Sequence, residues 1–190
     1  MRPEISLQKN FSKRTTVDIA LIALFASLGI ATKSVVQPLV ATITGPLYIP
    51  TGAVAGGVYM MWPVMAYGLV RKPGTATIVS LAQALFSLFI PVGNFGLFSF
   101  AIYLAPGLAI DGFFLLSKHN ACCAACCIGA AAIANAVGTF SYSALLLALP
   151  GFALLFFTLV AAVSGSIGGF IANTLLIRTR KIGFTSMKVR

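Results

Sequence analysis

The sequence has few charged residues, and acidic residues are almost absent. Of its 190 residues, thirteen are Lys or Arg, three are Asp or Glu and one is His, so charged side chains make up 8% of the chain. Soluble domains carry about 25% charged residues. With the His taken as neutral, uncharged stretches cover residues 34–70, 73–110 and 119–177, and about 20 apolar residues can cross a bilayer. The sequence therefore predicts a multi-pass protein of the cell membrane with almost no room for a soluble domain.

The scarcity of reactive groups excludes several classes of function. No Gly-x-x-x-x-Gly-Lys phosphate loop occurs, so the chain is not expected to hydrolyse ATP by that route. Three carboxylates and one His offer no convincing nucleophile–base pair, which argues against an enzyme. The net charge of +10 follows the membrane topology described below, so no nucleic-acid partner is predicted.

The four cysteines lie together within residues 122–127. The spacing Cys123-x-x-Cys126, close to His119, could indicate metal or redox chemistry. However, consecutive thiols on a helix point to different faces, and on the reducing cytoplasmic side Cys behaves as a small hydrophobic residue. Helix packing is therefore the preferred interpretation, with palmitoylation as the lesser alternative. No metal site and no cofactor are predicted.

Cutting the apolar runs at turn signals predicts an all-α bundle of six transmembrane helices. Residues 1–16 and 179–190 form basic tails, and residues 17–178 form the membrane domain. Asp18 is placed to cap the first helix. The predicted spans are about 17–32, 52–70, 75–90, 97–116, 121–148 and 152–177.

Residues 35–50 are apolar but are interrupted by Pro38, Gly45, Pro46 and Pro50. Such a segment is not expected to keep its backbone hydrogen bonds internal across lipid, so we predict a Pro-rich extracellular loop or a re-entrant segment. With six spans and the amino terminus inside, twelve Lys or Arg lie on the cytoplasmic side and only Lys33 lies outside. This strong positive-inside bias places both termini in the cytoplasm.

The first span allows one alternative. A basic segment, a short apolar run and then Gly29-Ile30-Ala31 also resemble a secretory signal peptide. Cleavage after Ala31 would leave five spans in the same orientation.

Two charged residues are candidates for function because charges inside a membrane are costly. Asp111 lies near the cytoplasmic end of its span, where it could pair with Arg71 or Lys72, or could couple transport to an ion or proton. Lys33 follows the first predicted span, where it could snorkel to the interface or face a ligand. Polar and aromatic side chains at similar depth would complete a pocket for a small molecule. The predicted substrate-binding residues are Lys33, Gln37, Tyr48, Trp62, Gln83, Asn94, Tyr103, Asn135 and Tyr142.

The first span also carries small residues at steps of three and four: Ala20, Ala23, Ser27 and Ala31. Small residues on one face allow another helix to approach closely in lipid. This face is predicted to contact a partner subunit, with packing inside the chain's own bundle as the alternative.

Together these features resemble the substrate-binding S components of energy-coupling factor (ECF) transporters. The motif Ala23-x-x-x-Ser27 stands where Ala-x-x-x-Ala is typical, and residues 43–50 are similar to the first extracellular loop of that family. Gly45-Pro46, then residues 71–74, then Gly107-Leu108 ahead of Asp111 are most similar to the branch that handles thiamine or its hydroxymethylpyrimidine precursor. The similarity covers residues 18 to about 178.

The resemblance implies a function and a set of partners. The chain would capture a vitamin-like molecule outside the cell and deliver it inward together with a transmembrane coupling subunit and two ATPase subunits. The third span lacks the carboxylates expected in the thiamine-type branch, and Lys33 favours a neutral or anionic ligand by charge complementarity. The alternatives are a stand-alone ion-coupled secondary transporter or channel, and a nonenzymatic membrane assembly subunit.

Overall fold

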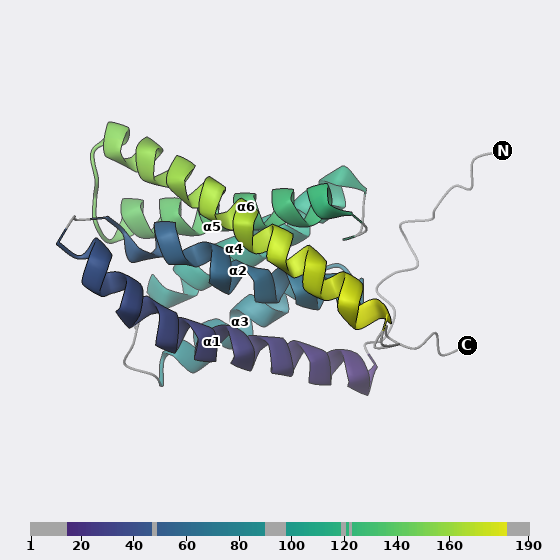
Figure 1. Cartoon of the computed structure of the whole chain (residues 1–190). Helices are drawn as coiled ribbons and strands as arrows, with labels where there is room; N and C mark the ends of the chain where they lie inside the picture. Colours follow the sequence, from purple (N-terminus) through teal and green to yellow (C-terminus); the bar gives the residue numbers. More distant parts are fainter. Residues whose placement is uncertain (1–14, 47–48, 90–97, 119–120, 122, 182–190) are drawn as a thin grey trace.

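The computed structural model describes residues 15–46, 49–89, 98–118, 121 and 123–181, and this part of the chain is a bundle of six α-helices (Figure 1). The all-helical prediction is confirmed for these residues. Five of these helices are long and apolar enough to cross a membrane, and the sixth is a shorter apolar helix. The helices are α1 (Thr16–Thr44), α2 (Thr51–Val70), α3 (Thr75–Ser87), α4 (Phe98–Ser117), α5 (Ala124–Leu145) and α6 (Gly151–Lys181).

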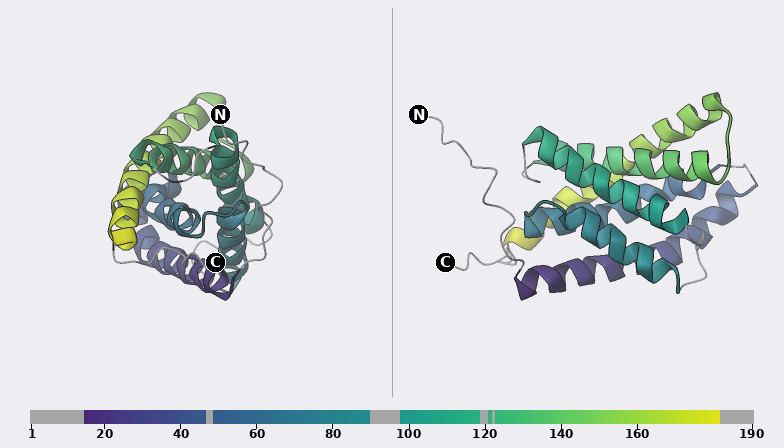
Figure 2. Two further views of the ribbon diagram at one scale, coloured as in Figure 1. Left: turned by 90° about the vertical axis from the view of Figure 1, so that its right-hand side faces the viewer. Right: turned by 180° about the vertical axis from the view of Figure 1, so that it is seen from behind.

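Helix α2 lies in the middle of the bundle and contacts all five other helices (Figure 2). Within its most apolar window 72% of residues are buried, against 22–33% in the other four candidate spans. Glycines on α2 and α6 explain why α2 can lie so deep in the bundle. A Cβ atom on Gly57 would lie 2.0 Å from the Ser164 carbonyl oxygen, and one on Gly168 would lie 1.8 Å from the Gly57 carbonyl oxygen. Helices α2 and α6 therefore meet backbone to backbone, as small residues permit in membranes.

This contact predicts that Gly168→Ala destabilises the protein. The added methyl group would clash with backbone, which can move only if the two helices separate, and overpacking of this kind costs about 1–3 kcal/mol. Gly112→Ala is the matched control, because a Cβ atom there meets nothing within 4 Å and alanine favours a helix by about 1 kcal/mol over glycine. Thermal unfolding in detergent should show a lower Tm for Gly168→Ala only. Equal Tm values for the two variants would contradict the close packing of α2 and α6.

Helix α1 differs most from the prediction. It continues to Thr44 with Pro38 inside it, so the predicted loop at residues 35–50 is wrong for residues 35–44. A proline within a membrane helix removes one hydrogen bond, and the packed surroundings can tolerate that loss. Grouping Pro38 with Pro46 and Pro50 as one interruption therefore overstated its effect. As a result, Lys33 lies within the membrane helix rather than directly after it.

The other helix bounds differ by less. Helix α3 ends at Ser87 and has 13 residues, about 20 Å at 1.5 Å per residue, which is shorter than a hydrocarbon core of about 30 Å. Helix α5 is shorter at both ends than residues 121–148. Helix α6 continues to Lys181, so Arg180 and Lys181, which were predicted in the tail, lie with Arg178 in its last turn.

The beginning of α1 and the end of α6 lie at the same end of the bundle, on the right in Figure 1. Here Asp18 accepts hydrogen bonds from the Thr15 amide (2.9 Å) and the Thr15 hydroxyl (2.7 Å). The N-cap residue is therefore Thr15, and Asp18 stabilises the start of α1 from within its first turn. The same carboxylate forms a salt bridge of 2.7 Å with Lys72. Arg180 donates to the carbonyl oxygens of Gly68 and Ala121. The basic residues at this end therefore connect α1, α2 and α6.

Asp111 does not pair with Arg71 or Lys72, and that prediction is wrong. Its carboxylate accepts hydrogen bonds from the Ala76 amide (3.4 Å), the Thr77 amide (2.7 Å) and the Thr77 hydroxyl. These amides belong to the first turn of α3, where backbone N–H groups have no partner within the helix. Asp111 thus caps α3 from α4, because a negative charge is favourable at a helix amino end.

Candidate ligand-binding pocket

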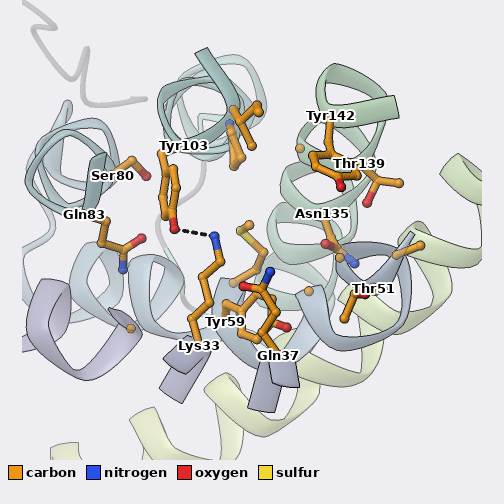
Figure 3. A pocket seen from close by; sticks show the side chains of 18 of the residues that line it. Lys33, Gln37, Thr51, Tyr59, Ser80, Gln83, Tyr103, Asn135, Thr139 and Tyr142 are labelled. Atoms are coloured by element: carbon orange, nitrogen blue, oxygen red, sulfur yellow. Dashed lines mark hydrogen bonds between the residues drawn. The ribbon is translucent and has the colours of Figure 1, made fainter. Parts of the chain in front are cut away.

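A pocket lies between α1, α2, α3, α4 and α5 (Figure 3). Its lining residues belong to the half of the bundle away from the salt bridge between Asp18 and Lys72. Its cavity volume is about 110 Å³. It is lined by polar and aromatic side chains together with small and apolar ones. The lining residues that carry polar groups are Lys33, Gln37, Thr51, Tyr59, Ser80, Gln83, Tyr103, Asn135, Thr139 and Tyr142.

Helical spacing explains how single helices present several of these groups. Gly29, Lys33 and Gln37 follow one another at steps of four on α1, and residues at i and i+4 lie on the same helix face. On α5, Asn135, Thr139 and Tyr142 are separated by four and three residues. Both faces turn toward the same pocket, so two short sequence patterns supply much of its polar lining.

Two glycines leave room for the side chains opposite them. A Cβ atom on Gly29 would lie 2.0 Å from Gln83 Nε2, and one on Gly56 would lie 1.8 Å from Asn135 Oδ1. Asn135 is held in place because its Nδ2 donates to the Ala161 carbonyl oxygen of α6 (2.8 Å). Glycine at these positions lets polar side chains reach the centre of the bundle.

The charge of the pocket comes from Lys33. Its ammonium group donates a hydrogen bond to the Tyr103 hydroxyl and lies 3.9 Å from the centre of the Tyr103 ring. A cation this close to an aromatic face is attracted by the ring quadrupole. Among the described residues that line it there is no Asp, Glu, His or Cys. The pocket thus presents one positive charge that neutral groups surround.

Four buried polar atoms on the pocket-lining side chains have no hydrogen-bond partner in the described part of the chain. They are Gln37 Oε1, Tyr59 Oη, Gln83 Nε2 and Thr139 Oγ1. Buried polar groups are satisfied in most proteins, and leaving one unpaired costs about 1–3 kcal/mol. Four such groups around one cavity, from α1, α2, α3 and α5, provide donors and acceptors for a polar molecule.

The structure brings together six of the nine predicted binding residues: Lys33, Gln37, Gln83, Tyr103, Asn135 and Tyr142. Tyr48 and Asn94 lie outside the described residues. Trp62 does not line the pocket; its indole N–H donates to Thr32 Oγ1 (2.9 Å), and its ring packs near Phe25. Through these two contacts with α1, the Trp62 side chain fills the space between α1 and α2.

Sequence reasoning missed several lining residues. Thr139 could have been found from its spacing to Asn135 and Tyr142, and Ser80 from its spacing to Gln83. Tyr59 was not among the predicted binding residues, although its hydroxyl is one of the unpaired groups. Thr51 begins α2, at a boundary that the apolar pattern does not define sharply.

The predicted partner face of α1 is exposed. The side chains of Ala20, Ala23, Ser27 and Ala31 are all exposed. The opposite face of the helix packs into the bundle through residues such as Leu21 and Phe25. The Ser27 hydroxyl donates to the Leu24 carbonyl oxygen within its own helix. The alternative that this face packs inside the chain's own bundle is therefore wrong.

The arrangement of helices has a counterpart among solved structures. The chain is similar to a solved structure described as the crystal structure of an S-component of an ECF transporter, with a TM-score of 0.73 and 19% sequence identity over 93% of this chain and 91% of that one. This likeness establishes the fold.

The family follows from a second comparison. A model of the family described as ABC-type cobalt transport system, permease component, matches residues 17–137, and the chain belongs to that family. No curated protein matches. The fold and the family are those of transporter components rather than enzymes, and with five membrane-spanning candidates they identify a multi-pass protein of the cell membrane.

Proposed function

We propose that this chain is the substrate-specificity subunit of an ECF-type importer, which captures a small, vitamin-like organic molecule outside the cell and delivers it inward. The observation that supports this most directly is the pocket itself: four unpaired polar atoms and one ammonium group surround a single cavity within an S-component fold. Ligand pockets generally combine apolar walls with a few convergent polar groups.

The residues of the pocket favour an organic ligand over a bare metal ion. The family description refers to cobalt transport, and first-row metal ions bind imidazole, thiolate or carboxylate groups. The described residues contain no group of three or more His, Cys, Asp or Glu that could hold a metal. An ammonium group would also repel a cation, so the same argument disfavours thiamine and leaves a neutral or anionic molecule.

The proposed topology has six membrane crossings with both termini in the cytoplasm. The turn after α2 carries Arg71 and Lys72, α4 ends beside Lys118, and α6 ends in basic residues, all at the end of the bundle where α1 begins. Basic residues concentrate on the cytoplasmic side of membrane proteins. This orientation places the pocket in the outer half of the membrane.

The proposed partners are a transmembrane coupling subunit and two ATPase subunits. The exposed small-residue face of α1 offers a surface that another helix can approach closely. Because the chain lacks a phosphate loop, partner subunits would supply ATP hydrolysis. The ion-coupled alternative has less support, since the Asp111 carboxylate is occupied by the amino end of α3.

Gentle detergent purification followed by mass spectrometry tests this function. Purified full-length chain, incubated with the small-molecule fraction of a cell extract and then washed, should retain one organic molecule in near-stoichiometric amount. Purification from cells that produce the whole system should also yield a coupling subunit and ATPase chains. Uptake that follows an ion gradient without ATP or partner chains would instead support a secondary transporter.

A further inference from the structure

The positive charge of Lys33 lies at a depth where charge is costly. Helix α1 continues for eleven residues beyond Lys33, to Thr44, which is about 16 Å. Val35, Leu39 and Ile43 in that extension are 62%, 65% and 70% exposed, as expected of side chains that face lipid. Lys33 therefore lies inside the membrane-spanning part of α1, where an ionisable residue usually pairs with an opposite charge.

No acidic side chain of the described residues provides that opposite charge. Asp18 forms its salt bridge with Lys72, and Asp111 caps α3, both at the other end of the bundle. Tyr103 solvates the ammonium group through its hydroxyl and its ring, but it brings no negative charge. The pocket thus contains the Lys33 ammonium group but, among the described residues, no negative charge that would neutralise it.

The unpaired polar atoms suit an anion at the same place. Gln83 Nε2 and the Tyr59 and Thr139 hydroxyls can each donate a hydrogen bond, and Gln37 Oε1 can accept one. In Figure 3 the Lys33 side chain extends toward Tyr103 between Gln83 and Tyr59, inside the ring of labelled polar residues. A ligand that accepts from several donors and offers a donor of its own would satisfy this set.

Charge and size narrow the ligand further. One lysine neutralises one negative charge, whereas a phosphate monoester carries about −1.5 to −2 and would leave an excess in the membrane. The cavity volume of about 110 Å³ is of the order of the roughly 150 Å³ cavity that holds benzene. Apolar lining residues such as Ile30, Met60 and Ile102 suit the body of such a molecule.

We infer that the ligand is a small organic monoanion, about the size of a single ring, and that its carboxylate binds Lys33 beside Tyr103. This inference rests on the proposed capture function and specifies its substrate class. Entry of the carboxylate neutralises Lys33, the one cation among the described lining residues. The surrounding amide and hydroxyl groups orient the remainder of the molecule. A bare cation or a cationic vitamin would leave two positive charges together in a membrane interior.

The test compares the wild-type full-length chain with Lys33→Met and with the control Lys118→Met, which removes an exposed lysine at the end of α4. Each protein is incubated in detergent with the small-molecule fraction of a cell extract, washed and extracted, and the bound molecules are identified by mass spectrometry in both polarities. We expect wild type and Lys118→Met to retain an organic acid with one negative charge. Lys33→Met should retain at least about 30-fold less, because removing one partner of a buried charge pair weakens binding strongly.

A second measurement separates binding from a merely structural role of Lys33. Removing an uncompensated buried charge is expected to leave the Tm of the ligand-free protein unchanged or to raise it. If the contact between Lys33 and Tyr103 served only to hold α1 against α4, Lys33→Met would lower that Tm.

Three results would overturn the inference. A neutral or cationic molecule bound to wild type would do so while leaving the capture function intact. Equal retention of the anion by Lys33→Met would also do so, because another group would then bind the carboxylate. If folded wild-type protein retained no small molecule, the capture function itself would be wrong and the inference would fall with it.

Discussion

Gly52→Phe is expected to abolish ligand binding while the protein still folds. Gly52 lies in the first turn of α2 and lines the pocket, and a Cβ atom on it meets nothing within 4 Å. A phenyl ring can therefore enter the pocket without clashing with backbone. Because a cavity of about 110 Å³ cannot hold both the ring and a ligand, the affinity should fall by at least about 100-fold, which corresponds to roughly 2.8 kcal/mol.

Gly112→Phe is the control for this substitution. Gly112 is also a helical glycine with nothing within 4 Å of a Cβ atom, but it lies on α4 away from the pocket. The amount of small molecule that co-purifies with each variant measures binding, and thermal unfolding measures folding. If Gly52→Phe retained the molecule at the level of Gly112→Phe, the ligand would have to bind elsewhere in the chain.

Ser27→Trp is expected to stop transport without weakening ligand binding. Ser27 is on the exposed face of α1, and its hydroxyl is bonded only to its own helix. An indole ring would prevent close approach of a coupling helix, because small residues are what permit that approach in membranes. Uptake by cells with the complete system should fall by at least about tenfold, since a lost helix contact of 1.4 kcal/mol alone gives that factor.

Val163→Trp serves as the matched control, because Val163 is 66% exposed on α6 and is equally open to a large side chain. Uptake and co-purification of the coupling subunit should both persist in this variant. A Ser27→Trp protein that lost its bound small molecule together with uptake would indicate damage to the fold. A Ser27→Trp protein with unchanged uptake would show that the partner binds another face.

Composition and periodicity were sufficient to predict most of the helices but not where α1 ends. Long uncharged runs allow few structures other than helices in lipid, so their number and order follow from local sequence. The end of α1 depends on whether the surroundings tolerate one missing hydrogen bond at Pro38, and that property belongs to the packed bundle. Local sequence rules written for isolated helices therefore placed the end of α1 twelve residues too early.

The sequence predicted which kinds of residue would form the binding site better than it predicted which individual residues would meet there. Polar side chains within apolar spans are costly, so Lys33, Gln83 and Asn135 were natural candidates. Trp62 was chosen for its depth, and depth does not determine which way a helix face points. Asp111 was assigned the wrong partner because the sequence offers two nearby cations but does not reveal that the amides of α3 come closer.

What the sequence alone determined is the class of protein: an all-helical membrane bundle with long uncharged runs and a few polar groups inside them. These properties follow from the free energy of transferring side chains into lipid, to which each residue contributes independently. What only the tertiary structure decided is that Lys33 meets Tyr103, 70 residues away, in a cavity whose described lining residues include no acidic side chain. Helical period specifies which residues share a face, whereas the packing of five helices specifies which faces share a pocket. The charge of the proposed ligand follows from that packing.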